Sequence, residues 1–69
     1  MTRWERLSKD EIMKRLRTNI RRYILFIILK GEPEPIPVWE GLTIKSLLQE
    51  LARWESDPDY EGAFIEIEY

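Results

Sequence analysis

The chain of 69 residues contains no cysteine and no histidine. Without cysteine it cannot form a disulfide, and without either residue it lacks the usual ligands of a structural zinc ion. The missing histidine also removes the side chain that most often transfers protons near neutral pH. A domain of this size buries only about 60% of the surface that its unfolded chain exposes. Its stability must therefore come from packing or from association with another chain.

Long apolar stretches are also absent. The longest, from Tyr23 to Leu29, has seven residues, against the ~20 that are needed to cross a bilayer. The N-terminus has no apolar segment of the kind found in signal peptides. We therefore expect a single cytoplasmic domain spanning residues 1–69, with no membrane association.

The apolar run itself predicts an inner β-strand, because it is short and rich in isoleucine and aromatic residues. Side chains on a strand point alternately to opposite faces. Both faces of this strand would be apolar, so both need a cover. The two sets are Ile24, Phe26 and Ile28 on one face, and Tyr23, Leu25, Ile27 and Leu29 on the other.

Capping patterns predict two helices. Ser8 and Glu11 fit a capping box, in which each side chain accepts a hydrogen bond from the backbone of the other. The first helix is expected from about residue 9 to about residue 19. Thr43 is expected to cap a second helix, which the sequence Ser56-Asp57-Pro58 ends.

Two further strands complete the predicted fold. Residues 36–40 are expected to form a short edge strand, because Pro37 has no N–H to donate to a neighbour. Residues 63–69 alternate between apolar and polar, which places Phe64, Glu66 and Glu68 away from the core. The order helix, strand, strand, helix, strand predicts an α+β fold. We expect a three-stranded sheet in the order 2-1-3, packed with two helices.

The central strand then poses a covering problem. If both helices lie on one face of the sheet, large apolar side chains remain bare on the other, and such a patch is typical of an interface. Either the helices cover opposite faces, or a partner, such as a second copy in a homodimer, covers the second face. The strand register, and hence the outward half of the strand, is not fixed by the sequence. The predicted protein-interface residues are Tyr23, Leu25, Ile27, Leu29, Trp39 and Phe64.

Charge is divided unevenly along the chain. Residues 1–31 carry nine Lys/Arg and three Asp/Glu, whereas residues 32–69 carry two and ten. This asymmetry indicates either an interaction segment or two halves that pack against each other. Arginine clusters can bind phosphates, so nucleic-acid binding is an alternative hypothesis. The candidate residues are Lys14, Arg15, Arg17, Arg21 and Arg22.

The acidic segment that starts at Asp57 has an EF-hand-like spacing. Counted from Asp57 as position 1, acidic residues occupy positions 1, 3 and 5, a glycine occupies position 6 and a glutamate occupies position 12. However, Pro58 stiffens the second position, and the strand pattern replaces the exiting helix of an EF-hand. An ordinary acidic turn is the preferred interpretation, with Ca²⁺ binding as a weaker alternative.

No catalytic constellation is present. Glu66 and Glu68 could act as a general acid and a general base only if they lay in a pocket. The chain also has no cysteine or histidine and no phosphate-binding glycine loop. We therefore predict no enzymatic activity, no cofactor and no metal. The leading hypothesis is a small interaction or adaptor module that binds a protein partner and self-associates. The alternative is a small nucleic-acid-associated regulatory protein that uses the basic face of its first helix.

Overall fold

The computed structural model describes residues 4–14 and 20–68. Within these ranges the chain forms an α+β fold, in which a four-stranded antiparallel sheet carries two helices. The elements in chain order are β1 (Trp4–Leu7), α1 (Lys9–Met13), β2 (Arg22–Leu29), β3 (Ile36–Gly41), α2 (Ile44–Glu55) and β4 (Tyr60–Glu68). Neither described helix is long and apolar enough to cross a membrane.

The sheet has the order β1-β4-β2-β3, so the prediction of three strands is wrong. The three expected strands keep their predicted order, because β2 lies between β4 and β3. The unexpected strand, β1, pairs antiparallel with the outer edge of β4, with Leu7 opposite Ile65. The central place predicted for the apolar run is confirmed.

The proline-bearing strand β3 lies at the opposite edge of the sheet, as expected. Pro37 is opposite Phe26, whereas Trp39 is opposite Leu25, so Val38 is an additional residue on the β3 side. A β-bulge of this kind interrupts the hydrogen-bond ladder and bends the strand. The bulge and the proline together make this edge a poor template for another strand. In the turn between β2 and β3, Gly31 adopts a φ of 86°, which suits glycine.

Both helices start at the predicted caps but differ in how they are capped. The Ser8 hydroxyl accepts a hydrogen bond from the Glu11 backbone N–H, and the Glu11 carboxylate accepts one from the Ser8 N–H, each at 3.3 Å. The capping box is therefore confirmed. Thr43 is the N-cap of α2, but its side chain makes no capping hydrogen bond to the described residues. The predicted first helix continues to residue 19, but α1 ends at Met13 and residues 15–19 lie outside the described residues.

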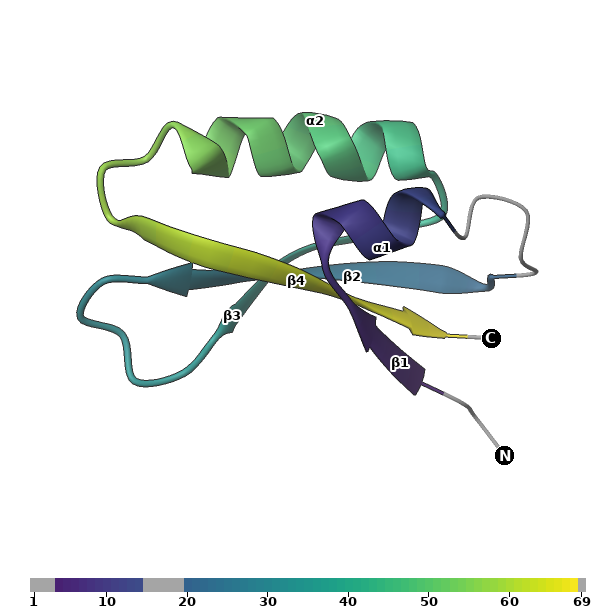
Figure 1. Cartoon of the computed structure of the whole chain (residues 1–69), viewed down its shortest axis with the longest axis horizontal. Helices are drawn as coiled ribbons and strands as arrows, with labels where there is room; N and C mark the ends of the chain where they lie inside the picture. The colour runs from purple at the N-terminus through teal and green to yellow at the C-terminus, as the bar shows by residue number, and fades with distance from the viewer. Residues whose placement is uncertain (1–3, 15–19, 69) are drawn as a thin grey trace.

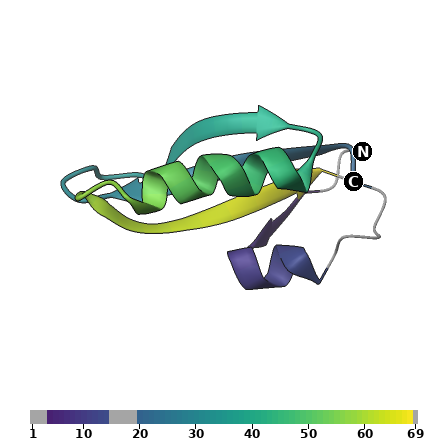
Figure 2. The same cartoon turned by 90° about the horizontal axis from the view of Figure 1, so that it is seen from above.

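The core lies between the sheet and the helices, and both helices cover the same face (Figure 1). Seen from above, α2 runs along β2 and β4, and α1 lies beside β4 and β1 (Figure 2). This arrangement excludes the alternative in which the helices cover opposite faces. The buried core residues are Leu7, Ile12, Tyr23, Leu25, Ile27, Leu47, Leu51, Ile65 and Ile67.

Candidate interaction surface on the open face of the sheet

The face of the sheet that points away from the helices carries every second residue of the strands. No element within the described parts of the chain covers it (Figure 1). We call this surface the open face. Strand register assigns to it Arg6 of β1; Arg22, Ile24, Phe26 and Ile28 of β2; Pro37 and Glu40 of β3; and Phe64, Glu66 and Glu68 of β4.

An apolar strip, formed by Ile24, Phe26, Ile28 and Phe64, occupies the middle of the open face. Phe26 and Phe64 are directly opposite on β2 and β4, and their rings stack with centroids 4.9 Å apart and planes inclined by 12°. Ile28 is 37% exposed, and the other three side chains are half-buried. Gly62, which has no side chain, lies opposite Ile28. The strip therefore leaves apolar surface partly exposed on the outward side of the sheet.

Arg6 of β1 flanks the strip on the side of Phe64. Its guanidinium lies 4.2 Å from the centroid of the Phe64 ring, within the range of a cation–π contact. The same group is 3.2 Å from the Glu66 carboxylate. Arg6 thus extends the aromatic stack of Phe26 and Phe64 into the charged part of the open face.

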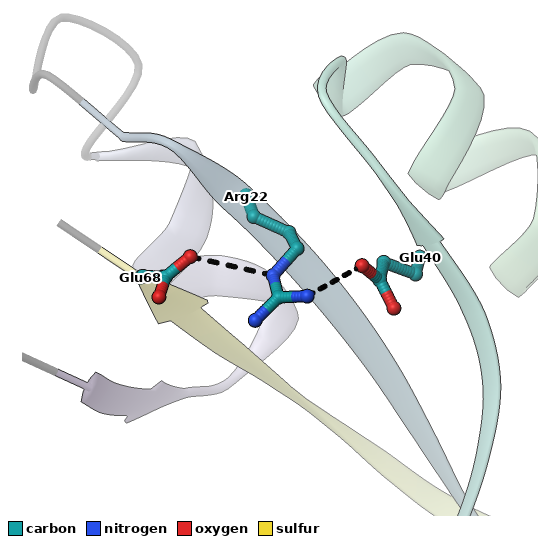
Figure 3. A network of polar contacts seen from close by, with 3 residues as sticks. All are labelled: Arg22, Glu40 and Glu68. Carbon is teal, nitrogen blue, oxygen red and sulfur yellow. Dashed lines mark hydrogen bonds and ion pairs between the residues drawn. The ribbon is translucent and has the colours of Figure 1, made fainter. Parts of the chain in front are cut away.

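A second charged group centres on Arg22, which lies between two carboxylates (Figure 3). Its Nη1 donates a hydrogen bond of 2.7 Å to Glu40, and its Nε lies 3.4 Å from a carboxylate oxygen of Glu68. The hydrogen bond to Glu40 raises the pKa of Arg22. The positive charges of Arg6 and Arg22 are therefore compensated within the chain.

These ion pairs also give the charge asymmetry of the sequence a physical role. Arg6 with Glu66, Arg22 with Glu40, and Lys9 with Glu55 at 3.4 Å each join the basic first half of the chain to its acidic second half. The sequence allowed two interpretations of this asymmetry, an interaction segment or two halves that pack against each other. The described residues show the second. Because these groups are partly exposed, each pair adds little stability.

The structure corrects the choice of interface residues on β2. The predicted residues Tyr23, Leu25 and Ile27 are buried beneath the helices, where no partner can reach them. The outward half of the strand consists instead of Ile24, Phe26 and Ile28. A shift of one residue in register reverses which side chains face the core, and the sequence of β2 is apolar at both sets of positions.

The other predicted interface residues divide between the two faces. Leu29 and Trp39 are half-buried and pack against the core cluster. Phe64 lies on the open face, with Glu66 and Glu68 on the same side of β4 as the sequence indicated. The aromatic pairing of Phe64 with Phe26 is a signal that could have indicated the outward half of β2, because the sequence placed the last strand beside the apolar run with Phe64 facing away from the core.

The predicted nucleic-acid residues are only partly described. Lys14 and Arg21 are exposed, whereas Arg22 is half-buried and held by its two carboxylates. Arg15 and Arg17 lie outside the described residues. Of the three members of this set that the structure describes, two are therefore exposed and one is held in ion pairs.

The acidic segment after Asp57 forms a turn followed by a strand, and not the helix-flanked loop of an EF-hand. The Asp57 carboxylate accepts a 2.8 Å hydrogen bond from the backbone N–H of Asp59, which closes a tight turn. Strand β4 begins at Tyr60, so Glu68 lies at its far end, beside Arg22. Within residues 4–14 and 20–68, no group of three His, Cys, Asp or Glu residues is arranged to hold a metal ion.

A shallow hollow lies beside the end of α2, lined by Glu50, Arg53, Trp54 and Asp57. Its arginine is paired with Glu50 at 3.4 Å. The carboxylates of Glu66 and Glu68 lie elsewhere, each beside an arginine of the open face. The carboxylate pair that the sequence singled out, Glu66 and Glu68, therefore lies outside this hollow.

Comparisons with protein-family models, with curated proteins and with solved structures found no match to this chain. We therefore base the proposed function on the geometry of the open face.

Proposed function

We propose that the chain is a non-enzymatic interaction module that binds a protein surface through the open face of its sheet. The observation that carries this proposal is the apolar strip, which remains partly exposed while the opposite face of the same strands is packed beneath two helices. Burying a large apolar side chain completely contributes about 1.5–3 kcal/mol. Part of that stabilisation is still available at each residue of the strip.

The composition of the open face supports a protein as the partner. Aromatic residues and arginine are enriched at protein interfaces, in which an apolar centre is surrounded by a polar rim. Here the stacked rings of Phe26 and Phe64 form the centre, and the ion pairs of Arg6 and Arg22 form part of the rim. The pairing of both arginines with carboxylates makes the open face a poor binding site for phosphates.

Two exposed apolar residues provide a matched test of this proposal. Ile28 is 37% exposed within the strip, whereas Leu42 is 74% exposed between β3 and α2, away from it. The wild-type chain and the variants Ile28→Glu and Leu42→Glu would be cross-linked in lysate of the source cell. We expect the wild type and Leu42→Glu to trap the same protein, and Ile28→Glu to lose it. If all three chains trap the same set of proteins, the open face is not the binding surface.

Nucleic-acid binding is the second candidate, favoured by the exposure of Lys14 after α1 and of Arg21 before β2. Contacts with phosphates weaken steeply with salt. A gel shift that decreases between low and moderate ionic strength, and that decreases further in Arg21→Glu, would support this candidate. Unchanged binding by Arg21→Glu would exclude a role for this residue.

A further inference from the structure

We infer that the partner of the open face is a second copy of this chain. Two copies would pack sheet against sheet, across a two-fold axis beside the stacked rings of Phe26 and Phe64, with the helices on the outside. This inference rests on the proposed function, because it names the partner of the same surface. Four features of the described residues support it: symmetry, charge, size and the state of the sheet edges.

Symmetry is compatible with a second copy because the strip is apolar and each of its side chains remains partly exposed. In a two-fold dimer the same patch of each subunit forms the interface, so it must be complementary to itself. The stacked rings of Phe26 and Phe64, with Ile28 on the same face, form an apolar patch that can contact its own copy without a complementary charge. The axis beside the rings buries both strips at once. Two sheets that pack in this way form a sandwich, with their side chains interleaved between them.

The charges around the strip neither repel a copy nor select a strongly charged partner. The open face carries two arginines and three glutamates, and each arginine is already paired within the chain. The whole chain has a net charge of −2. A partner that is recognised through opposite charge requires a strong electrostatic potential of one sign on the open face. A second copy of the chain does not require such a potential.

The size of the face also fits a dimer. The Cα trace as a whole extends 34 Å along its longest axis and 18 Å along its shortest, and the longest axis runs along the strands in Figure 1. A sheet face within these outer limits is of the same order as the ~800 Å² that each partner buries in a standard interface. A chain of 69 residues without cysteine or histidine gains additional burial in this way, where a disulfide or zinc ion is not available.

The edges of the sheet are less suitable for self-association than its face. At one edge, Pro37 removes a backbone donor and the bulge opposite Leu25 and Phe26 disrupts the ladder. At the other edge, β1 has four residues and carries Glu5 and Arg6. A two-fold axis perpendicular to the sheet and centred on Glu5 or Arg6 would place that residue opposite its own copy, and such like-charge pairs are unfavourable.

Sedimentation velocity over a range of protein concentrations tests the inference. We expect the wild type and Leu42→Glu to form a dimer, and Ile28→Glu to remain folded by circular dichroism while it associates at least tenfold more weakly. A wild-type chain that stays monomeric at every concentration would overturn the inference. If the wild type is monomeric but still cross-links to another protein, and Ile28→Glu does not, the proposed function stands. If the wild type is monomeric and Ile28→Glu cross-links to the same proteins as the wild type, both the inference and the proposed function fail.

Spin-label distances provide a second measurement that does not alter the strip. The chain has no cysteine, so a single cysteine introduced at Glu40 or Lys45 labels one site. Glu40 lies on the open face beside Arg22, whereas Lys45 lies on the exposed side of α2. We expect a short distance between labels in the Glu40→Cys dimer and a much longer one in the Lys45→Cys dimer. A dimer with the reverse pattern would associate through its helices, contrary to the inference.

Discussion

Ile27 and Ile28 are neighbours on β2, but they lie on opposite faces of the sheet. Ile27 has no exposed surface and packs in the core between the sheet and the helices, whereas Ile28 is 37% exposed on the open face. The two residues have the same side chain and almost the same position along the strand. A difference between equal substitutions at these positions therefore reports the difference between the two faces.

We expect Ile27→Ala to destabilise the chain far more than Ile28→Ala. Removing a buried isoleucine side chain leaves a cavity and costs about 2–5 kcal/mol. The total free energy of unfolding of a chain of this length is about 3–10 kcal/mol. Ile28→Ala should cost less than about 1 kcal/mol in the monomer, because its side chain is already partly in water. Urea denaturation at low protein concentration measures both, and equal losses would contradict the assignment of faces.

Most of the fold could be predicted because the signals are local. The run from Tyr23 to Leu29 is too apolar for an edge strand, and Pro37 restricts its own strand to an edge. Ser8 with Glu11 marks one helix start, and Thr43 marks the other. β1 could not be predicted in this way. It has four residues, two of them charged, and is a strand only because β4, which follows it by more than fifty residues, supplies its partner.

The outward half of β2 could not be predicted for a related reason. The register of β2 against β4 shifts between Ile28 and Leu29, and that of β2 against β3 shifts between Leu25 and Phe26. Each shift depends on how a distant segment packs, not on the residues of β2 alone. Because both faces of β2 are apolar, the usual alternation of polar and apolar residues does not decide between them. The candidate surface therefore follows from the tertiary structure.

The two helix caps should differ in how much they stabilise the fold. The Ser8 side chain accepts a hydrogen bond from Glu11, whereas Thr43 makes no such bond to the described residues. We expect Ser8→Ala to cost about 0.5–2 kcal/mol, the usual range for loss of an N-cap. Thr43→Ala should cost less. Urea denaturation gives both free-energy changes. Hydrogen exchange should show weaker protection of the α1 backbone amides in Ser8→Ala than in the wild type. A larger effect at Thr43 would contradict the observed capping.

Gly41 should tolerate an added methyl group less well than Gly62. A Cβ atom at Gly41 would lie 2.5 Å from Cζ2 of Trp39, so the indole ring would have to move, whereas at Gly62 the nearest atom, on Ile28, is 3.7 Å away. Overpacking of this kind costs about 1–3 kcal/mol. We expect Gly41→Ala to be destabilised and its tryptophan emission shifted, because Trp39 packs against the core.

Gly62→Ala is the matched control for this substitution. Both glycines lie in strands, and alanine restricts the unfolded chain more than glycine does. Where the native backbone accepts alanine without strain, as at Gly62, the change should be neutral or stabilising by less than about 1 kcal/mol. Equal destabilisation of the two variants would show that the position of the Trp39 ring does not determine the cost.

The stability of the fold should decrease at alkaline pH, in part through Tyr23. Burial raises the pKa of Tyr23 above its ordinary value of 10.0. The folded chain therefore favours the neutral phenol, and the unfolded chain ionises first. The contribution of Tyr23 is fully present below the unfolded pKa of about 10 and is lost as the pH rises through the higher folded pKa.

Tyr23→Phe isolates this contribution, because phenylalanine keeps the ring and removes the titrating hydroxyl. We expect the free energy of unfolding of the wild type to fall more steeply than that of Tyr23→Phe between about pH 9 and about pH 11, where tyrosine ionises. Lysines titrate in the same range, so the difference between the two curves is the relevant quantity. Tyr60→Phe should show a similar difference, because burial, followed by the charge of Glu55, raises the pKa of Tyr60 as well. Parallel curves for the wild type and Tyr23→Phe would mean that this hydroxyl ionises equally readily in the folded and unfolded chain, contrary to its position in the core.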